Sequence, residues 1–523
     1  MSCNKYCKEA FRVNHSTKKR ERRRRQRIAR RLREKQWEDQ PAPMFRAEGI
    51  VYELADRARG LASAGIGAIH QLVRRVGLAE AINARLILLK KHLPYWESDH
   101  VLNIAFNILC GGTCLEDIEL RRNDEVYMDA LGAERIPDPT TAGDFCRRFE
   151  VGHVVSLMEA INSVRLKVWK QQSAGFLKRA TIDADGTLAP TTGECKEGMD
   201  ISYKGVWGYH PLVVSLANTG EPLLLLNRSG NRPSSEGAPD CLDQAIAVCR
   251  RGGFRNILLR GDTDFSQTEH LDRWDADGVE FVFGIDAARC LTETAGNLPP
   301  DSWNPLVRAP KYVVETKPRA RPPKVKQRIV CERGFKNIRL DSEHIAQFDY
   351  SPSKCSKTYR IVAVRKNLTI EKGEVALFDE IRYLFYITNA KRLSARRVVG
   401  EANNRCNQEN LIEQLKNGVR ALNMPVDNLV SNWAYMVMAS LAWTLKAWFA
   451  LLLPETGRWQ DKHAAEKRTV LRMEFKTFLN AFIRMPCQLV RSGRRLIFRL
   501  LAWNPWQRVF LRGVDALKEP LRC

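Results

Sequence analysis

The fold is decided by LKRATIDADGT (residues 177–187), YHPLVVSLAN (209–218) and GEPLLLLNRSGN (220–231). Each run is short, rich in apolar and β-branched residues and bounded by turn residues, which is typical of a strand. Two helix-like stretches then alternate with two further strand-like runs: CLDQAIAVCRRG (241–252), NILLRGD (256–262), SQTEHLDRWDADG (266–278) and VEFVFGIDA (279–287). Three strands in antiparallel succession, followed by this alternation, predict an α/β fold with a mixed sheet.

Two of these strands carry pairs of aspartates. Asp183 and Asp185 are two residues apart in TIDADGT, so their side chains point to the same face of the strand. Asp262 and Asp264 follow the apolar run NILLRG with the same spacing. Carboxylates that end adjacent strands offer the hard oxygen ligands that Mg²⁺ requires. An Asp at a strand end is also a common turn or helix cap, so neither pair is decisive alone.

A third candidate carboxylate lies far along the chain, in RCNQENLIEQLKNG (405–418). Glu409 is four residues after Arg405 and seven residues before Lys416. At about 100° per residue these three side chains form one stripe of a helix, with a carboxylate between two cations. The alternative interpretation is an ordinary solvated face with salt bridges.

The regions on either side of the sheet have different patterns. Helical spacing of apolar residues from about 60 to 175 predicts helices, and the strand-like runs RIVCERG, TYRIVAVRK, EVALFDE and RYLFYITN after a Pro-rich linker predict a β-rich insertion. We therefore expect six parts: a basic, disordered arm (1–45), an α-helical N-terminal DNA-binding domain (46–175), the first part of the core (176–299), the β-rich insertion (300–392), the last part of the core with the Glu409 helix (393–455) and a basic helical C-terminal region (456–523).

The charge of the chain is strongly positive. The 523 residues include 84 Lys and Arg against 60 Asp and Glu, a net charge of +24 at pH 7. Residues 18–36 hold twelve basic and two acidic residues, among them the run Arg22, Arg23, Arg24 and Arg25. Such a run repels itself, so we expect it to be disordered when free. Because phosphate neutralisation releases counterions, we predict a DNA-contacting arm that becomes helical on binding.

One segment raises the question of a membrane. Residues 431–453 are almost continuously apolar and long enough to cross a bilayer. Lys446 near the centre of this segment favours a helix buried in a soluble protein, because a central charge is costly in lipid. We therefore expect no membrane partner. The fourteen scattered cysteines, and an N-terminus without a secretory signal pattern, predict a cytoplasmic protein.

Taken in order, these segments resemble the DDE transposases of bacterial insertion sequences, specifically the cut-and-paste group with a Tyr-Arg-Glu-Lys signature. The resemblance is carried by ATIDADGT (180–187), KGVWGYHPLVV (204–214), NRSGNRPS (227–234), LLRGDTDF (258–265), YLFYITN (383–389) and RCNQENLIEQLKNG (405–418). The N-terminal GGTCLEDIELRR (111–122) and IPDPTTAGDF (136–145) are similar to the helical domain of that group. The resemblance therefore covers roughly residues 60 to 450.

The resemblance implies a role for individual residues. It implies that Asp185, Asp262 and Glu409 are the catalytic carboxylates and the ligands of two Mg²⁺ ions, for which Mn²⁺ is the expected substitute. Arg405 and Lys416 match the Arg and Lys of the signature and are implied to contact DNA phosphates.

The sequence departs from the family pattern at two positions. The signature Tyr, three residues before Arg405, is replaced by Ala402, so one contact of the family is absent here or supplied elsewhere. Asp264 stands where the family usually has Gly, which leaves it an alternative to Asp262. Asp183 is likewise an alternative to Asp185.

The resemblance also implies a fold and a reaction. The fold is an RNase H-like core with a β-rich insertion, flanked by α-helical N- and C-terminal regions. The reaction is metal-dependent cleavage of double-stranded DNA at terminal inverted repeats, followed by strand transfer of an insertion sequence. Because two DNA ends must meet, a homodimer on DNA is implied, associated with the bacterial nucleoid. Two alternatives stay open: a non-catalytic DNA-binding relative, and a nuclease on the same core that cuts without joining.

Overall fold

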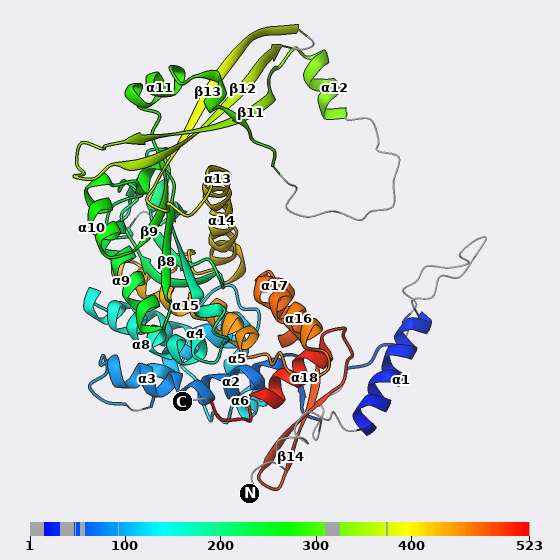
Figure 1. Cartoon of the computed structure of the whole chain (residues 1–523). Helices are drawn as coiled ribbons and strands as arrows, with labels where there is room; N and C mark the ends of the chain where they lie inside the picture. The colour runs from blue at the N-terminus through cyan, green and yellow to red at the C-terminus, as the bar shows by residue number, and fades with distance from the viewer. Residues whose placement is uncertain are drawn as a thin grey trace, which may run out of the picture. The chain divides into compact units, whose positions relative to one another are not determined.

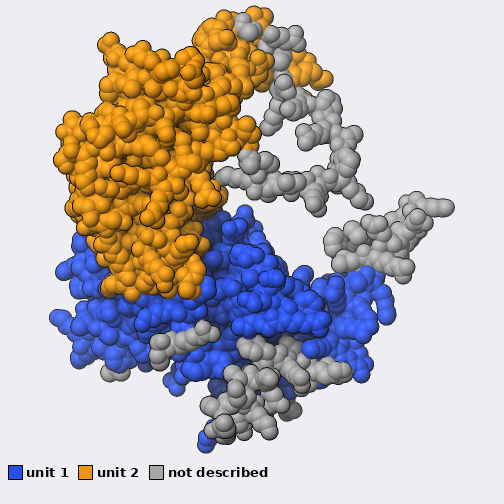
Figure 2. Space-filling model, viewed as in Figure 1, with its two compact units in different colours: residues 1–173, 189–199, 413–523 blue, residues 174–188, 200–412 orange. Residues whose placement is uncertain are grey.

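The computed structural model describes residues 15–31, 47, 49–52, 58–92, 94–193, 195–308, 325–372 and 375–521. The chain forms two compact units, each built from separate stretches of sequence (Figure 2). Unit 1 comprises residues 1–173, 189–199 and 413–523, and unit 2 comprises residues 174–188 and 200–412. The N-terminal helices therefore share a unit with the C-terminal region, whereas the core strands share one with the insertion.

Unit 2 is built on a nine-stranded sheet with the order β10-β11-β12-β13-β9-β8-β2-β6-β7. The strands are β2 (Arg179–Gly186), β6 (Leu212–Leu216), β7 (Glu221–Leu226), β8 (Asn256–Gly261), β9 (Glu280–Ile285), β10 (Asn304–Pro305), β11 (Lys336–Tyr350), β12 (Tyr359–Lys372) and β13 (Val375–Thr388). Strands β2, β8 and β9 run parallel, whereas β6 and β7 continue the sheet antiparallel. The predicted mixed α/β sheet is confirmed. A short antiparallel pair, β4 (Asp200–Ile201) and β5 (Trp207–Tyr209), lies outside this sheet.

The β-rich insertion continues the core sheet. Strand β13 pairs antiparallel with β9, from Phe385 opposite Ile285 to Thr388 opposite Val282. One hydrophobic cluster joins core, insertion and the following helix: Leu258, Val282, Leu306, Ile345, Val362, Val364, Val398 and Val399. Two details of the prediction were wrong. RIVCERG lies mostly in helix α12 (Val325–Glu332), and EVALFDE and RYLFYITN belong to the single long strand β13.

Helices cover both faces of this sheet (Figure 1). Helices α9 (Ala238–Arg251) and α10 (Leu271–Ala276) lie on one side, and α13 (Ala395–Asn404) and α14 (Cys406–Glu413) lie on the other; α11 (Arg289–Gly296) follows β9. Because strand side chains alternate, β2 presents Asp183 and Asp185 together toward α13 and α14. The apolar residues that alternate with them, Ile182 and Ala184, are fully buried on the α9 side.

Unit 1 is predominantly helical. Its elements are α1 (His15–Arg31), β1 (Gly60–Leu61), α2 (Gly65–Val76), α3 (Leu78–Arg85), α4 (Glu97–Leu109), α5 (Ile118–Arg122), α6 (Glu125–Leu131), α7 (Pro139–Arg147), α8 (Val151–Trp169), β3 (Ala189–Pro190), α15 (Leu429–Leu451), α16 (Gln460–Arg472), α17 (Phe475–Phe478), β14 (Cys487–Ser492), β15 (Arg495–Leu500) and α18 (Gln507–Ala516). Strands β14 and β15 form a hairpin whose base pairs with β1. The sequence had led us to expect a purely helical C-terminal region, but this region also contains a β-hairpin.

Helix α15 forms the centre of unit 1, where it packs against α4, α8, α16 and α7. Within the described part of the chain it is the one helix long and apolar enough to span a membrane, and its most apolar window is wholly buried. The Nζ atom of Lys446 donates to the carbonyl oxygen of Leu471 at 2.8 Å and lies 3.8 Å from the ring centroid of Trp443. Burial lowers the pKa of Lys446 to about 7. The buried lysine thus has protein partners.

The basic arm is partly helical. We expected a disordered arm over residues 1–45, but residues 15–31 form helix α1, which includes Arg22 to Arg25. Two anchors hold α1 to unit 1: Glu21 pairs with Arg508, and Arg24 donates to the carbonyl oxygen of Leu500 at 2.7 Å. These contacts within the chain stabilise helix α1, whereas repulsion along the run of like charges destabilises it. The remaining residues of the arm, 1–14 and 32–45, lie outside the described part of the chain.

Candidate active site

The candidate site forms where two parallel strands end side by side. Strand β2 carries Asp185 one residue before its end, and Asp262 follows the last residue of β8. Because Asp183 is opposite Arg260 in this parallel pair, the same register carried two residues further places Asp185 beside Asp262. Gly284 on β9 permits the close approach of this turn, since a Cβ there would lie 3.2 Å from the backbone carbon of Asp262.

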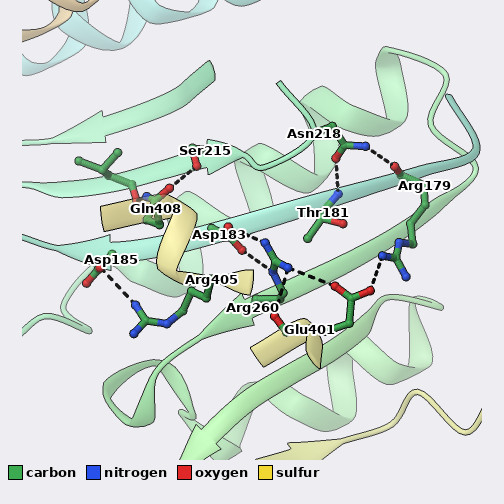
Figure 3. A network of polar contacts seen from close by, with 11 residues as sticks. Arg179, Thr181, Asp183, Asp185, Ser215, Asn218, Arg260, Glu401, Arg405 and Gln408 are labelled. Carbon is green, nitrogen blue, oxygen red and sulfur yellow. Dashed lines mark hydrogen bonds and ion pairs between the residues drawn. The ribbon is translucent and has the colours of Figure 1, made fainter. Parts of the chain in front are cut away.

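A single guanidinium lies between the two aspartates. Arg405 Nη1 is 3.2 Å from Asp185 Oδ2 and 3.6 Å from Asp262 Oδ2. Figure 3 shows the Arg405 side chain extending from the helical segment toward Asp185. The side chains of Asp185 and Arg405 are 16% and 18% exposed, and that of Asp262 is 36% exposed, so the group is accessible at one edge.

Glu409 approaches the same place from helix α14. The preceding residue, Gln408, is buried and binds strand β6: its Nε2 donates to Val213 O at 2.9 Å, and its Oε1 accepts from the hydroxyl of Ser215. Val213 is paired with Asp185 in the sheet, so Gln408 anchors α14 beside Asp185. The Glu409 side chain itself is exposed.

The carboxylates repel one another. The pKa of Asp185 is raised to about 6, chiefly by burial; the charge of Arg405 opposes this rise, and the charges of Asp262 and Glu409 add to it. Burial also raises the pKa of Asp262, to which Asp264 contributes. Asp264 is exposed, and its backbone N–H donates to Asp262 Oδ1 at 3.2 Å. The side chain of Asp262 therefore caps the short helical turn to which the alternative aspartate, Asp264, belongs.

Asp183 has a different environment from Asp185. Its side chain is 1% exposed, and its two oxygens accept from Nε and Nη2 of Arg260 at 2.7 and 2.8 Å. Arg260 also pairs with Glu401 at 3.1 Å, and Glu401 pairs with Arg179 at 2.6 Å (Figure 3). All of the charge of Asp183 is thus satisfied inside the protein, which favours Asp185 as the reactive member of the pair.

The helix with the proposed Arg-Glu-Lys stripe is not one regular helix. Helix α13 ends at Asn404, α14 begins at Cys406, and residues Gln414–Gly418 form a π-helical turn. The expectation of a single α-helical stripe from Arg405 to Lys416 was therefore wrong, because the break at Arg405 and the wider π-turn change the angular spacing. Such turns are frequent at functional sites. Lys416 is half-buried within this turn, which belongs to unit 1. Ala402 packs against the hydrophobic cluster of the sheet.

Three residues that the sequence reasoning missed position the site. Arg260 and Glu401 fix strand β8 and helix α13 around Asp183, and Gln408 fixes α14 on β6. The one available signal was Arg260, a charged residue inside the apolar run NILLRG. Its partners are 77 and 141 residues away, so local patterns could not identify them.

A divalent cation matches this donor set in chemistry and charge. Asp185, Asp262 and Glu409 supply hard carboxylate oxygens, and a bound cation would offset both the burial of Asp185, which chiefly raises its pKa, and the repulsion from Asp262 and Glu409. Within the described ranges, however, no three His, Cys, Asp or Glu side chains converge closely enough to form a metal site. Arg405 supplies the positive charge between the two aspartates in this structure.

Comparison with protein families identifies the chain. The family described as "Transposase DDE domain group 1" matches residues 59–521. The chain belongs to this family. The match runs through both units and begins after helix α1, so the basic helix of this transposase lies outside the family domain. The transposase domain includes the C-terminal hairpin and α18.

Other comparisons add little to the family assignment. No curated protein sequence matches the transposase. Among solved structures, it is similar to the piggyBac transposase in a cryo-EM structure of a synaptic complex with hairpin DNA. The two share 11% identity over 81% of this chain and 82% of that chain, with a TM-score of 0.32.

Proposed function

We propose that this transposase mobilises a bacterial insertion sequence by metal-dependent cleavage at terminal inverted repeats and strand transfer. The observation that carries the proposal is the charge imbalance at the ends of β2 and β8. Arg405 pairs with Asp185 and Asp262, and the charge of Glu409 also acts on Asp185, so three carboxylates gather around Asp185 beside this guanidinium. A structural ion-pair network has no need of surplus carboxylates, whereas a cation-dependent site requires them.

The strand order supports an RNase H-like core. Strands β7, β6 and β2 are antiparallel neighbours, and β8 and β9 then run parallel to β2 after helical connections. This is the arrangement that the resemblance implies for a catalytic core with carboxylates on neighbouring strands. We therefore assign Asp185 and Asp262 to the strands of the core and Glu409 to its closing helix.

Each residue has a role that follows from its position. Asp185 and Asp262 would hold divalent cations, two Mg²⁺ or the substitute Mn²⁺, with Glu409 as the third carboxylate. When bound, such cations activate an attacking water or 3′-hydroxyl and stabilise the leaving oxygen of an in-line displacement. Arg405 lies beside both aspartates, where its planar guanidinium is suited to a phosphate oxygen of the scissile strand. Lys416 is proposed to bind a further phosphate.

The proposed partner is double-stranded DNA with terminal inverted repeats. Arg22, Arg23 and Arg25 are exposed on α1 and available to phosphates, whereas Arg24 is half-buried and bonded to Leu500. Pairing of two DNA ends requires a homodimer on DNA, and the cytoplasmic nucleoid is the corresponding location.

Cleavage of a supercoiled plasmid tests the proposal. The plasmid carries the paired inverted repeats that border the element encoding this chain, and the reaction contains Mg²⁺. Joined products are expected from the wild type. Asp185→Asn, Asp262→Asn and Glu409→Gln should each abolish cleavage and retain DNA binding. Asp264→Asn and Glu413→Gln are matched controls, because both residues are exposed acids on the same turn or helix.

The possible results separate the alternatives. Nicked products without joining would indicate a nuclease on the same core, and binding without cleavage would indicate a non-catalytic relative. Full activity of Asp262→Asn together with loss of activity in Asp264→Asn would move the second carboxylate to Asp264.

A further inference from the structure

Helix α1 is held to unit 1 by one polar stripe. The half-buried residues of the helix are Thr17, Glu21, Arg24 and Ile28, which recur at spacings of four and three and therefore share one face. Glu21 is 14% exposed and accepts from Arg508 Nε at 2.6 and 2.9 Å. Arg24 reaches the end of β15 through the carbonyl oxygen of Leu500. The stripe thus docks α1 beside the hairpin strand β15 and helix α18.

Docking on this stripe turns the other basic side chains of α1 to solvent. The exposed cations are Lys18, Lys19, Arg20, Arg22, Arg23, Arg25, Arg27, Arg30 and Arg31. Glu21 is the one acidic residue of the helix, and Arg508 already neutralises it. Like charges four residues apart on a helix repel each other and destabilise it. A polyanion on the exposed faces would remove this repulsion.

The hairpin beside α1 carries a second group of exposed cations. Its turn follows Ser492, with Gly493 at a φ of 58°, a left-handed conformation suited to a two-residue hairpin. Arg491, Arg494, Arg495 and Arg499 are all exposed. A groove of about 480 Å³ between the hairpin and α2 is lined by Arg74, Arg491, Arg494 and Arg495, with Asp129 as its acidic residue.

The hairpin is seated firmly enough to present these arginines. The Phe498 ring packs on α2 at Gly67, where an added Cβ would lie 2.7 Å from the ring. At the base of the hairpin, Gly60 and Leu61 of β1 pair with Gln488 and Cys487.

We propose that the exposed arginines and lysines of α1 and the arginines of the β14–β15 hairpin form one surface in unit 1 that binds the backbone of duplex DNA. This inference rests on the proposed function for its partner and concerns residues other than those of the carboxylate site. A membrane is a poor partner, because α1 has no apolar face: its stripe of Thr, Glu, Arg and Ile is occupied by docking. Dense arginines on two adjacent elements suit successive phosphates of a duplex.

The first test removes the charges of the hairpin from the full-length protein. Binding to a non-specific duplex is measured in EDTA at several salt concentrations, for the wild type and for Arg494→Gln/Arg495→Gln/Arg499→Gln; Arg491 is left unchanged because it pairs with Asp129 at 3.8 Å. Each lost phosphate contact should reduce the slope of log K against log salt by about 0.9, so the variant should lose about 2 to 3 units of slope. Its affinity at moderate salt should fall about tenfold or more.

A matched control removes the same charge elsewhere. Arg289, Arg339 and Arg382 are each paired with an acid on their own element, Glu293, Asp341 and Glu380. The triple Gln variant of these three should keep the wild-type slope. An equal loss of slope in the control would show a bulk charge effect and overturn the proposal. A hairpin variant with an unchanged slope for duplex DNA would also overturn it.

The second test concerns the docking of α1. Glu21→Gln removes the partner of Arg508 and raises the net charge by one. General electrostatic attraction predicts equal or tighter DNA binding, whereas a docked surface predicts binding weaker by about threefold or more, because preorganisation is lost. Equal or tighter binding would overturn the docked arrangement.

These measurements are independent of the chemistry. They are made without divalent cations, so inactive carboxylates do not affect them. Loss of plasmid cleavage with normal hairpin-dependent binding would contradict only the proposed function, whereas intact cleavage with a hairpin-independent slope would contradict only this inference.

Discussion

Two polar clusters lie on the same face of the sheet and contain the same residue types. The charges of one cluster are balanced, whereas those of the other are not. In the closed cluster, defined as Asp183, Arg260, Glu401 and Arg179, two carboxylates face two guanidiniums, and the central pair is 1% and 4% exposed. In the open cluster, defined as Asp185, Asp262, Glu409 and Arg405, two carboxylates share one guanidinium, and the charge of Glu409 adds a third carboxylate near Asp185.

The balance of charge therefore distinguishes a structural cluster from a candidate catalytic cluster more clearly than the residue types do. Asp183 and Asp185 are two residues apart on one strand and face the same helices. The closed cluster is electroneutral and its central pair is buried, which stabilises the contact between β2, β8 and α13. The open cluster leaves negative charge at an accessible edge, where a cation would be bound.

The largest expected effect comes from Asp185→Asn in the open cluster. Cation stabilisation of developing charge is worth several kcal/mol, and about 1.4 kcal/mol corresponds to tenfold in rate. We expect cleavage of repeat-bearing DNA to fall about 10³-fold or more, with no loss of thermal stability. Single-turnover cleavage and thermal unfolding of the same preparation provide the two measurements. If the variant loses activity only because it unfolds, Asp185 has a structural role like that of Asp183, and the two clusters do not differ in function.

Breaking the closed cluster should affect stability instead. Asp183→Leu leaves Arg260 as a buried cation with only Glu401, and Arg260→Met leaves Asp183 without its partner. Each single change should reduce the free energy of unfolding by about 3–5 kcal/mol. The double variant Asp183→Leu/Arg260→Met should recover much of that loss, because no buried charge of the pair remains unpaired. Chemical denaturation of the wild type, the two single variants and the double variant gives a double-mutant cycle. If the losses in free energy of unfolding are additive, the proposed pairing is wrong.

The comparison also shows what the sequence could and could not reveal. Strand and helix order from 177 to 287 follows local periodicity, and the carboxylates at the ends of β2 and β8 follow from strand alternation. Distant pairings were out of reach: β13 joins β9 across about a hundred residues, and Asp183 finds Arg260 across 77. The break at Arg405 depends on how α13 and α14 pack on the sheet.

The C-terminal hairpin was a different kind of miss. The segment LVRSGRRLIFRL contains a Gly turn between alternating apolar residues, which is a hairpin signal. Its many arginines gave it the appearance of a basic amphipathic helix, so composition obscured the period of two.

A third prediction uses pH to test the raised pKa of Asp185, of which burial is the largest cause. The pKa of Asp185 is raised from 3.8 to about 6, so the unfolded chain loses this proton near pH 4 and the folded chain near pH 6. The contribution of Asp185 to stability is therefore greatest below pH 4, falls between about pH 4 and 6, and stays low above pH 6.

Asp185→Asn should remove this dependence. In EDTA the variant should match the wild type at pH 4 and exceed it at pH 7 by up to about 3 kcal/mol. Mg²⁺ should restore stability to the wild type at pH 7 and have less effect on the variant. Chemical denaturation across this pH range measures both effects, and parallel curves for the two proteins would contradict the raised pKa.

The smallest effect concerns the guanidinium that the open cluster already contains. Because Arg405 lies between Asp185 and Asp262, a divalent cation and this side chain compete for the same carboxylates. Arg405→Gln should therefore tighten Mn²⁺ binding to the DNA-free protein by about threefold to tenfold, the range expected for loss of one partly exposed ion pair. Mn²⁺ titration followed by electron paramagnetic resonance measures this affinity without any reaction.

Arg179→Gln is the matched control in the closed cluster, where the ion pair between Glu401 and Arg260 remains, and it should leave Mn²⁺ affinity unchanged. Equal affinities of the wild type and Arg405→Gln would show that the guanidinium does not occupy the position of the cation, and the charge imbalance would then have to be satisfied elsewhere.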